Sequence, residues 1–519
     1  RMKRLMILVL VGSVLGACSS RTGHVTGVAG RPTYIPEIPY GMVYIPGGSY
    51  AMGENDQDMP FLHQTRAKTV SIQAMYMDQT EISNNEYRQF VHWVRDSLAM
   101  DKIYYNMEDD DEASRYINYE DEYFDEGGLE YVEFDPSDRE LNRDKNYPIF
   151  SLNWDRQFDY SDPELVPLLA DMYYPQPERF YKRREIDTRK LMYRYYWIDL
   201  RAAAQRGRVN IVPDGYDREG NKLVDEHRSL ENPPNPFSGE PEGLDKDMGY
   251  FNKKGQNNAI RGHENRQRFI IDEIINVYPD TLCWVRDFTY SFHDPMTNMY
   301  FWHPAYDNYP VVGVTWQQAR AFSVWRTQLL NSWLLSMGEI FVNDFRLPTE
   351  GEWERGSRGD LALSPYPWGG PYIRNESGCF LGNFKPMRGR YFEDGGFHTV
   401  KVYSYNPNGW GLYCMAGNVA EWCETAYDES MYEFSNDLNT EHRYDAMDWD
   451  PPSMKRKVTR GGSWKDIGYY LHNGTRSYEY QDSSKSFVGY RNVMTHLGRG
   501  GRDFSREGGE EIQSDIQLK

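Results

Sequence analysis

The sequence predicts an α+β fold that contains little regular secondary structure. Three capping boxes, at Ser83, Thr315 and Thr349, predict the starts of helices. The second half carries short motifs of glycine, asparagine, tryptophan and arginine, whose Gly-Asn and Gly-Gly steps demand tight turns. Aromatic residues make up 15% of the chain, with 41 Tyr, 23 Phe and 14 Trp. Because rings bury large areas and Tyr and Trp also bond polar groups, we expect a core held by few long strands and by buried polar clusters.

The first helix is predicted to begin after Ser83, since Glu86 completes a capping box. Apolar side chains follow at helical spacing, at Tyr87, Phe90, Val91, Val94 and Leu98.

The second helix is predicted after Thr315, where Gln318 completes the box. Its expected buried stripe consists of Ala319, Phe322, Leu329 and Leu330. The third helix follows Pro348 and Thr349, with Glu352 completing its box.

Composition excludes several classes of protein. The chain has 58 Lys and Arg against 78 Asp and Glu, a formal net charge of -20, so it is a poor binder of nucleic acid. Its mean hydropathy of -0.78 resembles that of disordered chains, but the aromatic content does not. Only one stretch is apolar enough to approach a membrane, and it is short. A polytopic membrane protein and a coiled coil are therefore excluded.

The N-terminus is typical of a bacterial lipoprotein. Lys3 and Arg4 precede an apolar run at 5–15 that is too short to span a bilayer comfortably. Leu-Gly-Ala-Cys at 15–18 then matches the lipobox, in which the Cys18 thiol takes a diacylglycerol and becomes the new N-terminus. An uncleaved anchor, or a chance cysteine after a secretory signal, is the alternative.

We therefore expect a lipoprotein signal peptide at 1–17, and a lipid anchor with a Ser-, Gly-, Thr- and Pro-containing tether at 18–38. Several acyl chains at Cys18 would bind a membrane far more firmly than one. Ser19 and Ser20 provide no acidic retention signal, which favours the periplasmic face of the outer membrane.

Four further cysteines remain, and their state is left open by the sequence. An even number in an oxidising periplasm permits disulfides, while buried free thiols are the alternative. No metal-finger or redox spacing is present among Cys283, Cys379, Cys414 and Cys423.

The chain between the first two helix starts differs in character from the rest. It contains an acidic run at 108–112, tyrosine-dense acidic sequence at 116–134 and a proline-rich patch at 232–236. An acidic run is most often a solvated face, and calcium or a partner is the alternative. The tail from 499 has too few apolar residues to pack.

Motifs of the second half, together with two of the first, resemble the formylglycine-generating-enzyme (sulfatase-modifying factor) superfamily. The matching stretches are PYGMVYIPGGSYAMG (39–53), MDQTEISNNEYRQFV (77–91), PVVGVTWQQA (310–319), FRLPTEGEWERGSRG (345–359), GLYCMAGNVAEW (411–422), RGGSW (460–464) and GYR (489–491). The resemblance implies a C-type-lectin-related domain over 39–91 plus 310–494. It also implies a large insertion at 92–309 that binds a partner, and a flexible tail at 495–519.

Within that superfamily, the lipobox, the insertion, YRQFVHWVRDSLA (87–99) and YPDTLCWVRDFTYSF (278–292) most resemble the K lipoproteins of the type IX secretion and gliding machinery of Bacteroidetes. The resemblance implies a non-catalytic structural lipoprotein. Such a protein assembles with itself and with an N-type partner into a periplasmic ring, near other secretion components. A lectin-like or peptide-binding lipoprotein that uses the remnant cleft is the alternative.

The oxidases of the superfamily bind copper through two cysteines, five residues apart, just after the RGGSW-type motif. Thiolates suit Cu(I) as soft ligands. The matching positions here are Asp466 and Leu471, so we expect no copper, no catalytic residue and a pseudoenzyme.

The resemblance also implies calcium, which binds hard oxygen ligands. One site would use Asn383, Phe384, Asp394 and Gly396, the Phe and Gly through their carbonyls. A hydrogen-bonded Asx turn without an ion is the alternative. A second site would use Gly417, Val419 and Glu421, but the asparagine that the family uses there is Cys414.

Conspicuous arginines and tryptophans are expected to be structural. Guanidinium groups form bidentate pairs with carboxylates, so an anion site is the weaker interpretation. We expect Arg460, Arg476 and Arg491 to pair with acids such as Glu352 or Glu421, and Trp353, Trp422 and Trp464 to lie in the core.

Overall fold

The computed structural model describes residues 37–54, 67–107, 116–119, 122–124, 131–133, 150–154, 160, 162–198, 270–287, 293–387, 390, 392, 393, 395–446 and 450–498. Several predictions lie outside these ranges. They concern the signal peptide, Cys18, almost all of the tether, the acidic run at 108–112, Asp394 and the tail from 499.

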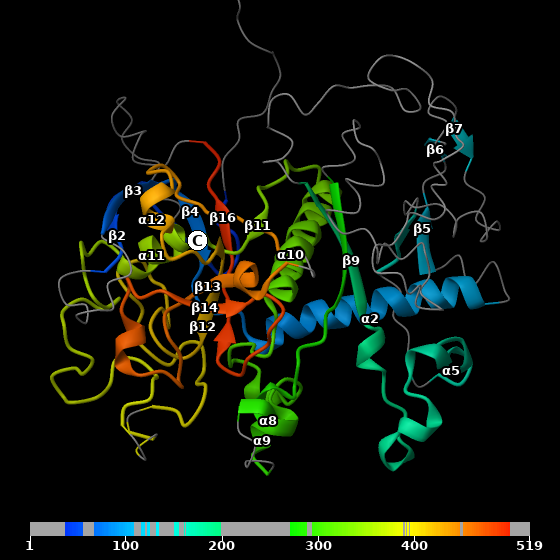
Figure 1. Cartoon of the computed structure of the whole chain (residues 1–519). Coiled ribbons are helices and arrows are strands. Elements are labelled where there is room, and N and C mark those ends of the chain that lie inside the picture. The colour runs from blue at the N-terminus through cyan, green and yellow to red at the C-terminus, as the bar shows by residue number, and fades with distance from the viewer. Residues whose placement is uncertain are drawn as a thin grey trace, which may run out of the picture. The chain divides into compact units, whose positions relative to one another are not determined.

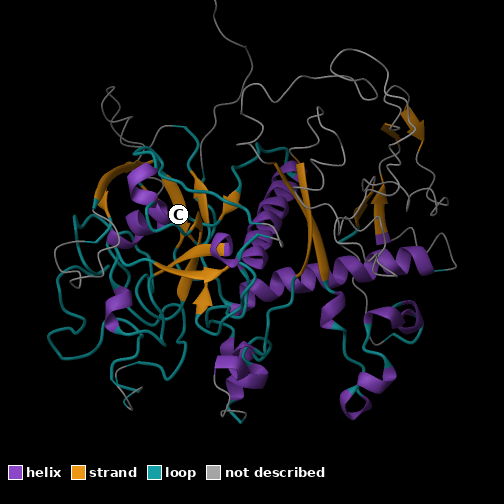
Figure 2. Cartoon of the chain, in the orientation of Figure 1, coloured by secondary structure: helices purple, strands orange, loops and turns teal. Residues whose placement is uncertain are grey.

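One four-stranded antiparallel sheet unites the two ends of the described chain (Figures 1 and 2). Its order is β1-β4-β16-β11. Register pairs Met42 with Asp78, and Val493 with Met77. The strands are β1 (Met42–Ile45), β4 (Met75–Asp78), β16 (Val493–Thr495) and β11 (Phe345–Arg346).

A second four-stranded sheet has the order β14-β13-β12-β15. Every residue of β12 is buried, which is the pattern of a strand covered on both faces. The register places Glu421 opposite Arg460. The strands are β14 (Ser477–Tyr480), β13 (Arg456–Arg460), β12 (Ala420–Ala426) and β15 (Val488–Gly489).

The three predicted capping boxes are confirmed. Ser83, Thr315 and Thr349 each accept a hydrogen bond from the backbone three residues on, and the side chain there bonds back. They begin α2 (Asn84–Asn106), α10 (Trp316–Ser336) and α11 (Glu350–Arg358).

The buried stripes are confirmed except at the end of α10. Tyr87, Phe90 and Phe322 pack in one aromatic core together with Trp422. Leu329, however, is exposed, since the second half of α10 extends beyond that core.

Part of the segment 92–309 belongs to the same core. The predicted border at residue 92 lies inside α2, and Tyr193, Val277 and Phe301 pack against the aromatic core. The antiparallel pair of β9 (Met192–Ile198) and β10 (Ile270–Asn276) lies beside α10 (Figure 1). Residues 38–519 accordingly form a single compact unit.

The remaining elements are short. The pairs are β2 (Gly48–Met52) with β3 (Lys68–Ile72), β5 (Ile117–Tyr119) with β8 (Phe150–Leu152), and β6 (Glu122–Phe124) with β7 (Tyr131–Glu133). The short α-helices are α5 (Leu165–Leu168), α8 (Cys283–Asp287), α9 (Pro295–Met299) and α12 (Met431–Phe434). Single 3-10 turns are η2 (Ala170–Met172), η3 (Gln176–Glu178), η4 (Phe180–Lys182), η5 (Thr188–Lys190), η9 (Pro304–Tyr306), η10 (Pro452–Lys455) and η11 (Gly468–Leu471).

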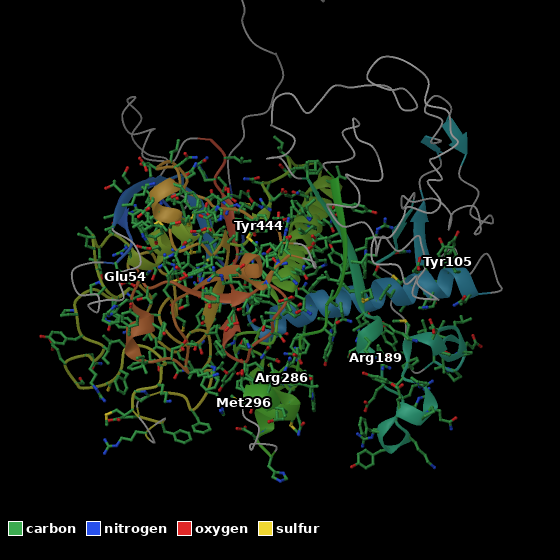
Figure 3. All side chains as sticks on the ribbon, in the orientation of Figure 1. Glu54, Tyr105, Arg189, Arg286, Met296 and Tyr444 are labelled. Atoms are coloured by element: carbon green, nitrogen blue, oxygen red, sulfur yellow. The ribbon has the colours of Figure 1, made fainter. Side chains whose placement is uncertain are left out.

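The predicted mixture of helix and sheet with modest regular structure is confirmed. Side chains fill the spaces between the ribbons, as Figure 3 shows, so the irregular segments are packed rather than open. Within the described ranges, no helix has the length and apolar character needed to cross a bilayer.

Candidate functional site

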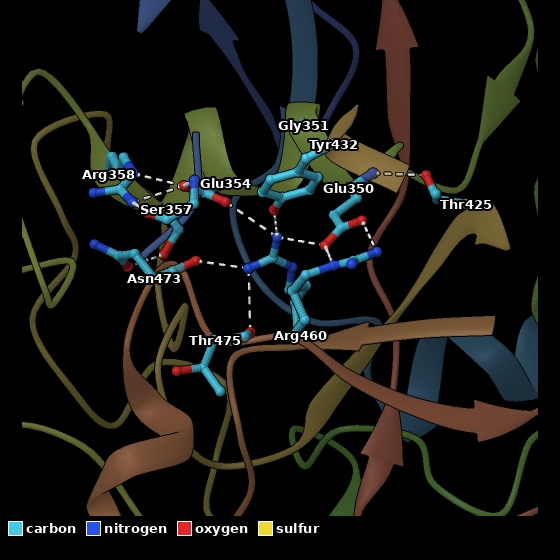
Figure 4. A network of polar contacts seen from close by, with 12 residues as sticks. Glu350, Gly351, Glu354, Ser357, Arg358, Thr425, Tyr432, Arg460, Asn473 and Thr475 are labelled. Atoms are coloured by element: carbon cyan, nitrogen blue, oxygen red, sulfur yellow. Dashed lines mark hydrogen bonds and ion pairs between the residues drawn. The ribbon is translucent and has the colours of Figure 1, made fainter. Parts of the chain in front are cut away.

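A buried network of carboxylates and guanidinium groups joins α11 to β13 (Figure 4). Glu350 accepts bonds from Arg460 at 2.5 Å and from Arg476 at 2.6 and 3.0 Å. Arg460 also reaches Glu354 at 3.1 Å and the Tyr432 hydroxyl at 2.9 Å. We call these five residues the α11 hub. Every charge in it has an opposite partner, as buried charges require.

The helix geometry explains why these acids meet the arginines. Glu350 and Glu354 are four residues apart and so share one face of α11. Glu354 also pairs with Arg358 one turn later, at 2.8 Å. Burial alone would raise the pKa of Glu350, but Arg476 and Arg460 outweigh it and hold the pKa below its ordinary value.

A second buried pair links β12 to the chain after β15. Arg491 donates to both oxygens of Glu421, at 2.6 and 2.7 Å, and the Trp353 indole donates to the same carboxylate at 2.8 Å. Glu81 lies nearby and binds the Asn418 amide at 2.7 Å. Burial, and then the Glu421 charge, raise the pKa of Glu81 well above its ordinary value.

The prediction that the arginines pair with carboxylates is confirmed, but one of the predicted acids, Glu352, has a different partner. Arg491 does pair with Glu421, but Glu352 pairs with Arg346, at 2.6 and 2.7 Å. The reason is that Glu352 caps its own helix and therefore points away from β13. The predicted core tryptophans Trp353, Trp422 and Trp464 are all buried.

Asp466 and Leu471, the two positions predicted from the resemblance to match copper-binding cysteines, have local structural roles. Asp466 accepts from the Ser463 amide at 3.0 Å and from its hydroxyl at 2.6 Å, which closes the turn after RGGSW. Leu471 is buried against Phe380, Phe384 and Ala416. A carboxylate in a turn and a packed hydrocarbon supply no soft ligand.

All four described cysteines are free thiols, so the disulfide alternative is not realised. Burial raises the pKa values of Cys283, Cys414 and Cys423, which keeps these thiols protonated. Cys379 is exposed.

The first predicted calcium site retains one free oxygen. The Asn383 amide nitrogen donates to the His398 carbonyl at 2.7 Å, while its buried Oδ1 has no hydrogen-bond partner. Phe384 is buried, Gly396 lies in the loop before Val400, and Asp394 lies outside the described residues. An unbonded amide oxygen of this kind fits a hard cation.

The second predicted calcium site is less favourable. Both oxygens of Glu421 are already bonded to Arg491, and the Cys414 thiol faces the Val402 carbonyl at 3.4 Å. Across the described part of the chain, no group of three or more His, Cys, Asp or Glu side chains is arranged for a metal.

A small cavity adjoins Cys414. It measures about 20 Å³, room for little more than one water molecule, and Trp368, Leu381 and Tyr405 are among its lining residues. A sugar or peptide side chain would not fit this cavity without rearrangement.

Sequence reasoning missed a cluster of cations on indole rings. Arg320 and Arg443 lie over Trp197 of β9, at 3.7 and 5.4 Å from the ring centroid. Lys457 lies 3.6 Å from the centroid of Trp316. We call these five residues the indole cluster. No spacing rule brings β9 to β13, so only the folded chain reveals it.

Comparison with known proteins places this fold. A family model described as the sulfatase-modifying factor enzyme 1-like domain matches residues 35–161 and 285–496. The formylglycine-generating enzyme of Thermomonospora curvata is 33% identical over 190 residues, 36% of this chain and 55% of that protein. The inactive C-alpha-formylglycine-generating enzyme 2 of Bos taurus is 34% identical over 190 residues, 35% of this chain and 49% of that protein. The chain thus spans about half the length of these curated relatives, and the family includes inactive members.

A solved structure, that of PvdO from Pseudomonas aeruginosa, aligns with 90% of this chain and 100% of its own, at 12% identity and a TM-score of 0.39. The family model, by contrast, covers more than half of the residues. The chain therefore belongs to the FGE-sulfatase family, whose members carry a sulfatase-modifying factor enzyme 1-like domain.

Proposed function

We propose that this chain is a non-catalytic structural lipoprotein of the outer membrane, a member of the K lipoproteins of the type IX secretion and gliding machinery. The observation that carries the proposal is the pair Asp466 and Leu471, which close a turn and fill a core where oxidases hold copper. The scaffold around them keeps its buried ion pairs. A fold can retain its packing after its reaction has gone.

The absence of oxidase activity is open to direct measurement. We expect the purified chain to bind no Cu(I) in competition with a chromogenic chelator. We also expect it to consume no oxygen in the presence of copper and a cysteine-containing peptide. Stoichiometric Cu(I) binding with peptide oxidation would refute the pseudoenzyme.

The second part of the proposal concerns assembly. We infer that the chain forms a periplasmic ring with copies of itself and with an N-type partner, held to the membrane by acyl chains on Cys18. Residues 162–284, which the family model does not match, form the centre of the predicted insertion at 92–309. We propose that this insertion provides the contact surface on a domain of C-type-lectin ancestry.

One exposed turn in this segment suits a partner. Phe180 and Tyr181 project from η4 at 76% and 92% exposure, and Lys182 to Arg184 follow directly. Tyr181 and Lys182 both have positive φ, at 51° and 57°, a strained conformation for side chains of this size. Aromatic residues and arginines are enriched in protein interfaces.

Purification from membranes in mild detergent tests the assembly. We expect a stoichiometric N-type protein and large annular particles. The double variant Phe180→Glu/Tyr181→Glu should lose the partner, whereas Tyr372→Glu/Phe392→Glu, at similarly exposed rings outside the segment, should retain it. A wild-type monomer that binds glycan or peptide would instead establish the lectin-like alternative.

The anchor and the cation have separate tests. Metabolic labelling of cells with a fatty acid should mark the wild type and not Cys18→Ala, and an unlabelled wild type would refute the anchor. We propose one structural calcium at Asn383, with carbonyl and carboxylate oxygens nearby completing the set. The melting temperature should rise with calcium, and Asn383→Ala should abolish the rise; equal stabilisation of both proteins would refute that site.

A further inference from the structure

The C-terminal end of α10 and the loop after it form an exposed apolar tip. Residues 329–342 read LLNSWLLSMGEIFV and contain one charged side chain, Glu339. Six large apolar side chains here are at least 40% exposed, namely Leu329, Trp333, Leu335, Met337, Ile340 and Phe341. We call residues 329–342 the apolar tip. Exposed apolar groups gathered in this way mark a binding surface.

The apolar groups surround the tip rather than forming one face. At about 100° per residue, Trp333 and Leu335 project about 200° apart on the helix. A helix that docks in a protein groove presents a single stripe. Apolar groups on opposite sides of the helix suit a medium that encloses the tip, and a lipid bilayer is such a medium.

The backbone of the tip closes its own hydrogen bonds. Gly338, at φ +72°, ends the helix, and the amides of Met337 and Glu339 bond back to Trp333 and Leu334, at 3.2 and 2.9 Å. The Val342 amide bonds the Asn331 side chain at 3.1 Å. Few backbone groups would therefore be left unpaired on entering an apolar phase.

The tip is attached firmly to the domain. Leu330 and Val342 at its base pack on the buried cluster of Met42, Tyr76, Phe345 and Met494. The tip is therefore joined by packing to the sheet β1-β4-β16-β11.

Tyr40, near the start of the compact unit, lies beside α10. The Tyr40 carbonyl accepts a bond from Arg326 of α10 at 3.5 Å. Arg326 precedes Trp333 by seven residues, about 10 Å along the helix. The twenty or so residues back to Cys18 can extend over at most about 70 Å. Their length therefore permits an acylated Cys18 and the tip to reach the same bilayer.

We propose that the apolar tip inserts into the interface of the lipid bilayer and orients the domain on the membrane. The inference rests on the proposed function, for which it names the membrane-facing surface. Apolar burial drives the insertion, so it needs no anionic lipid.

Vesicles of phosphatidylethanolamine and phosphatidylcholine test the insertion without the anchor. The chain from Ser19 onward contains the whole compact unit 38–519 and lacks both Cys18 and the apolar run. We expect it to bind these vesicles, with little change at about 0.5 M salt. Leu335→Glu/Phe341→Glu should lower the partition coefficient about tenfold or more.

The matched control is Leu438→Glu/Phe434→Glu. These side chains are 69% and 55% exposed, against 65% and 54% for Leu335 and Phe341, and lie outside the tip. The control should bind like the wild type. Vesicle binding by the tip variant equal to that of the wild type would overturn the proposal. A lower sedimentation coefficient of the variant without vesicles, together with unchanged vesicle binding, would show instead that the tip joins copies of the chain.

A label locates the contact even if the double variant folds poorly. In a Cys379→Ser background, Leu335→Cys provides one exposed thiol, and the wild-type Cys379 provides a control site. An environment-sensitive dye at residue 335 should shift to the blue on vesicle binding, while the same dye at Cys379 should not. No shift at residue 335 would refute insertion of the apolar tip. The proposals of acylation and ring assembly would not be affected, because they are tested on the full chain.

Discussion

The α11 hub and the indole cluster both bury cations, but they neutralise them in different ways. In the α11 hub, Arg460 and Arg476 have carboxylate oxygens within 2.5–3.1 Å. In the indole cluster, Lys457 lies 3.8 Å from its nearest acid, Asp445, and depends on the face of Trp316 and the Tyr444 carbonyl. Hydrogen-bonded charge pairs hold a geometry strictly, whereas a ring face tolerates shifts. The hub should therefore fix the family scaffold, and the indole cluster should attach β9 more loosely.

The largest effect should come from the hub. Glu350→Gln leaves two buried guanidinium groups without their shared carboxylate and should cost about 3–5 kcal/mol in the free energy of unfolding. Urea denaturation measures it, with Glu429→Gln, at an exposed acid, as the control. A loss below 1 kcal/mol would reverse the comparison.

Removal of the ring that receives two cations should cost less. Trp197 is half-buried, so Trp197→Ala should cost roughly 2 kcal/mol, from lost burial and lost cation–π contacts. Hydrogen exchange should show β9 and β10 opening first. If Trp197→Ala lowers amide protection in β12 as much as in β9 and β10, then the indole cluster stabilises the whole domain rather than β9 alone.

The contribution of Lys457 to the free energy of unfolding is expected to depend on pH. Burial lowers its pKa to about 8, from an ordinary value of 10.5. Between these values the unfolded chain binds more protons, so this residue makes the folded state more stable as the pH rises from 8 to 10.5. Below pH 8 the buried charge is a full cost, and Lys457→Met should stabilise the protein by about 1–2 kcal/mol at pH 7.

The difference in unfolding free energy between Lys457→Met and wild type should shrink across that window. Denaturation at several pH values measures it, and other groups cancel because both proteins share them. A constant difference would show that the lysine is not deprotonated on folding.

The smallest effect is expected at the edge of the indole cluster. Arg443 is about one-third exposed and pairs with Glu424 at 2.9 Å, so Arg443→Met should cost less than about 1 kcal/mol. A larger loss would mean that this pair acts as a hub in its own right.

Local sequence rules predicted the parts of the fold that local physics decides. The capping boxes at Ser83, Thr315 and Thr349 depend on residues three apart, and all three formed. Arginine pairing was predicted in kind, but the choice of Glu350 over Glu352 depends on which face of α11 meets β13. That relation is tertiary and has no local signal.

Other features arise only from contacts distant in sequence. Glu81 meets Glu421 and Asn418 across more than 300 residues, and Trp197 meets Arg443 across about 250 residues. The spacing of Leu329 predicts a buried position, but Leu329 is exposed because α10 extends beyond the core at that point. Of the candidate site residues, Asp466 and Leu471 could be located by motif alone, whereas their roles in a turn and a core could not.

The position of β1 in its sheet has a mechanical consequence. Among the described strands it pairs only with β4, and it is the first strand after the region proposed to be anchored. Tension on the proposed lipid anchor would enter the compact unit through these few residues and pass to β4 and then β16. The strength of this short ladder would then limit the force that each anchored copy can bear.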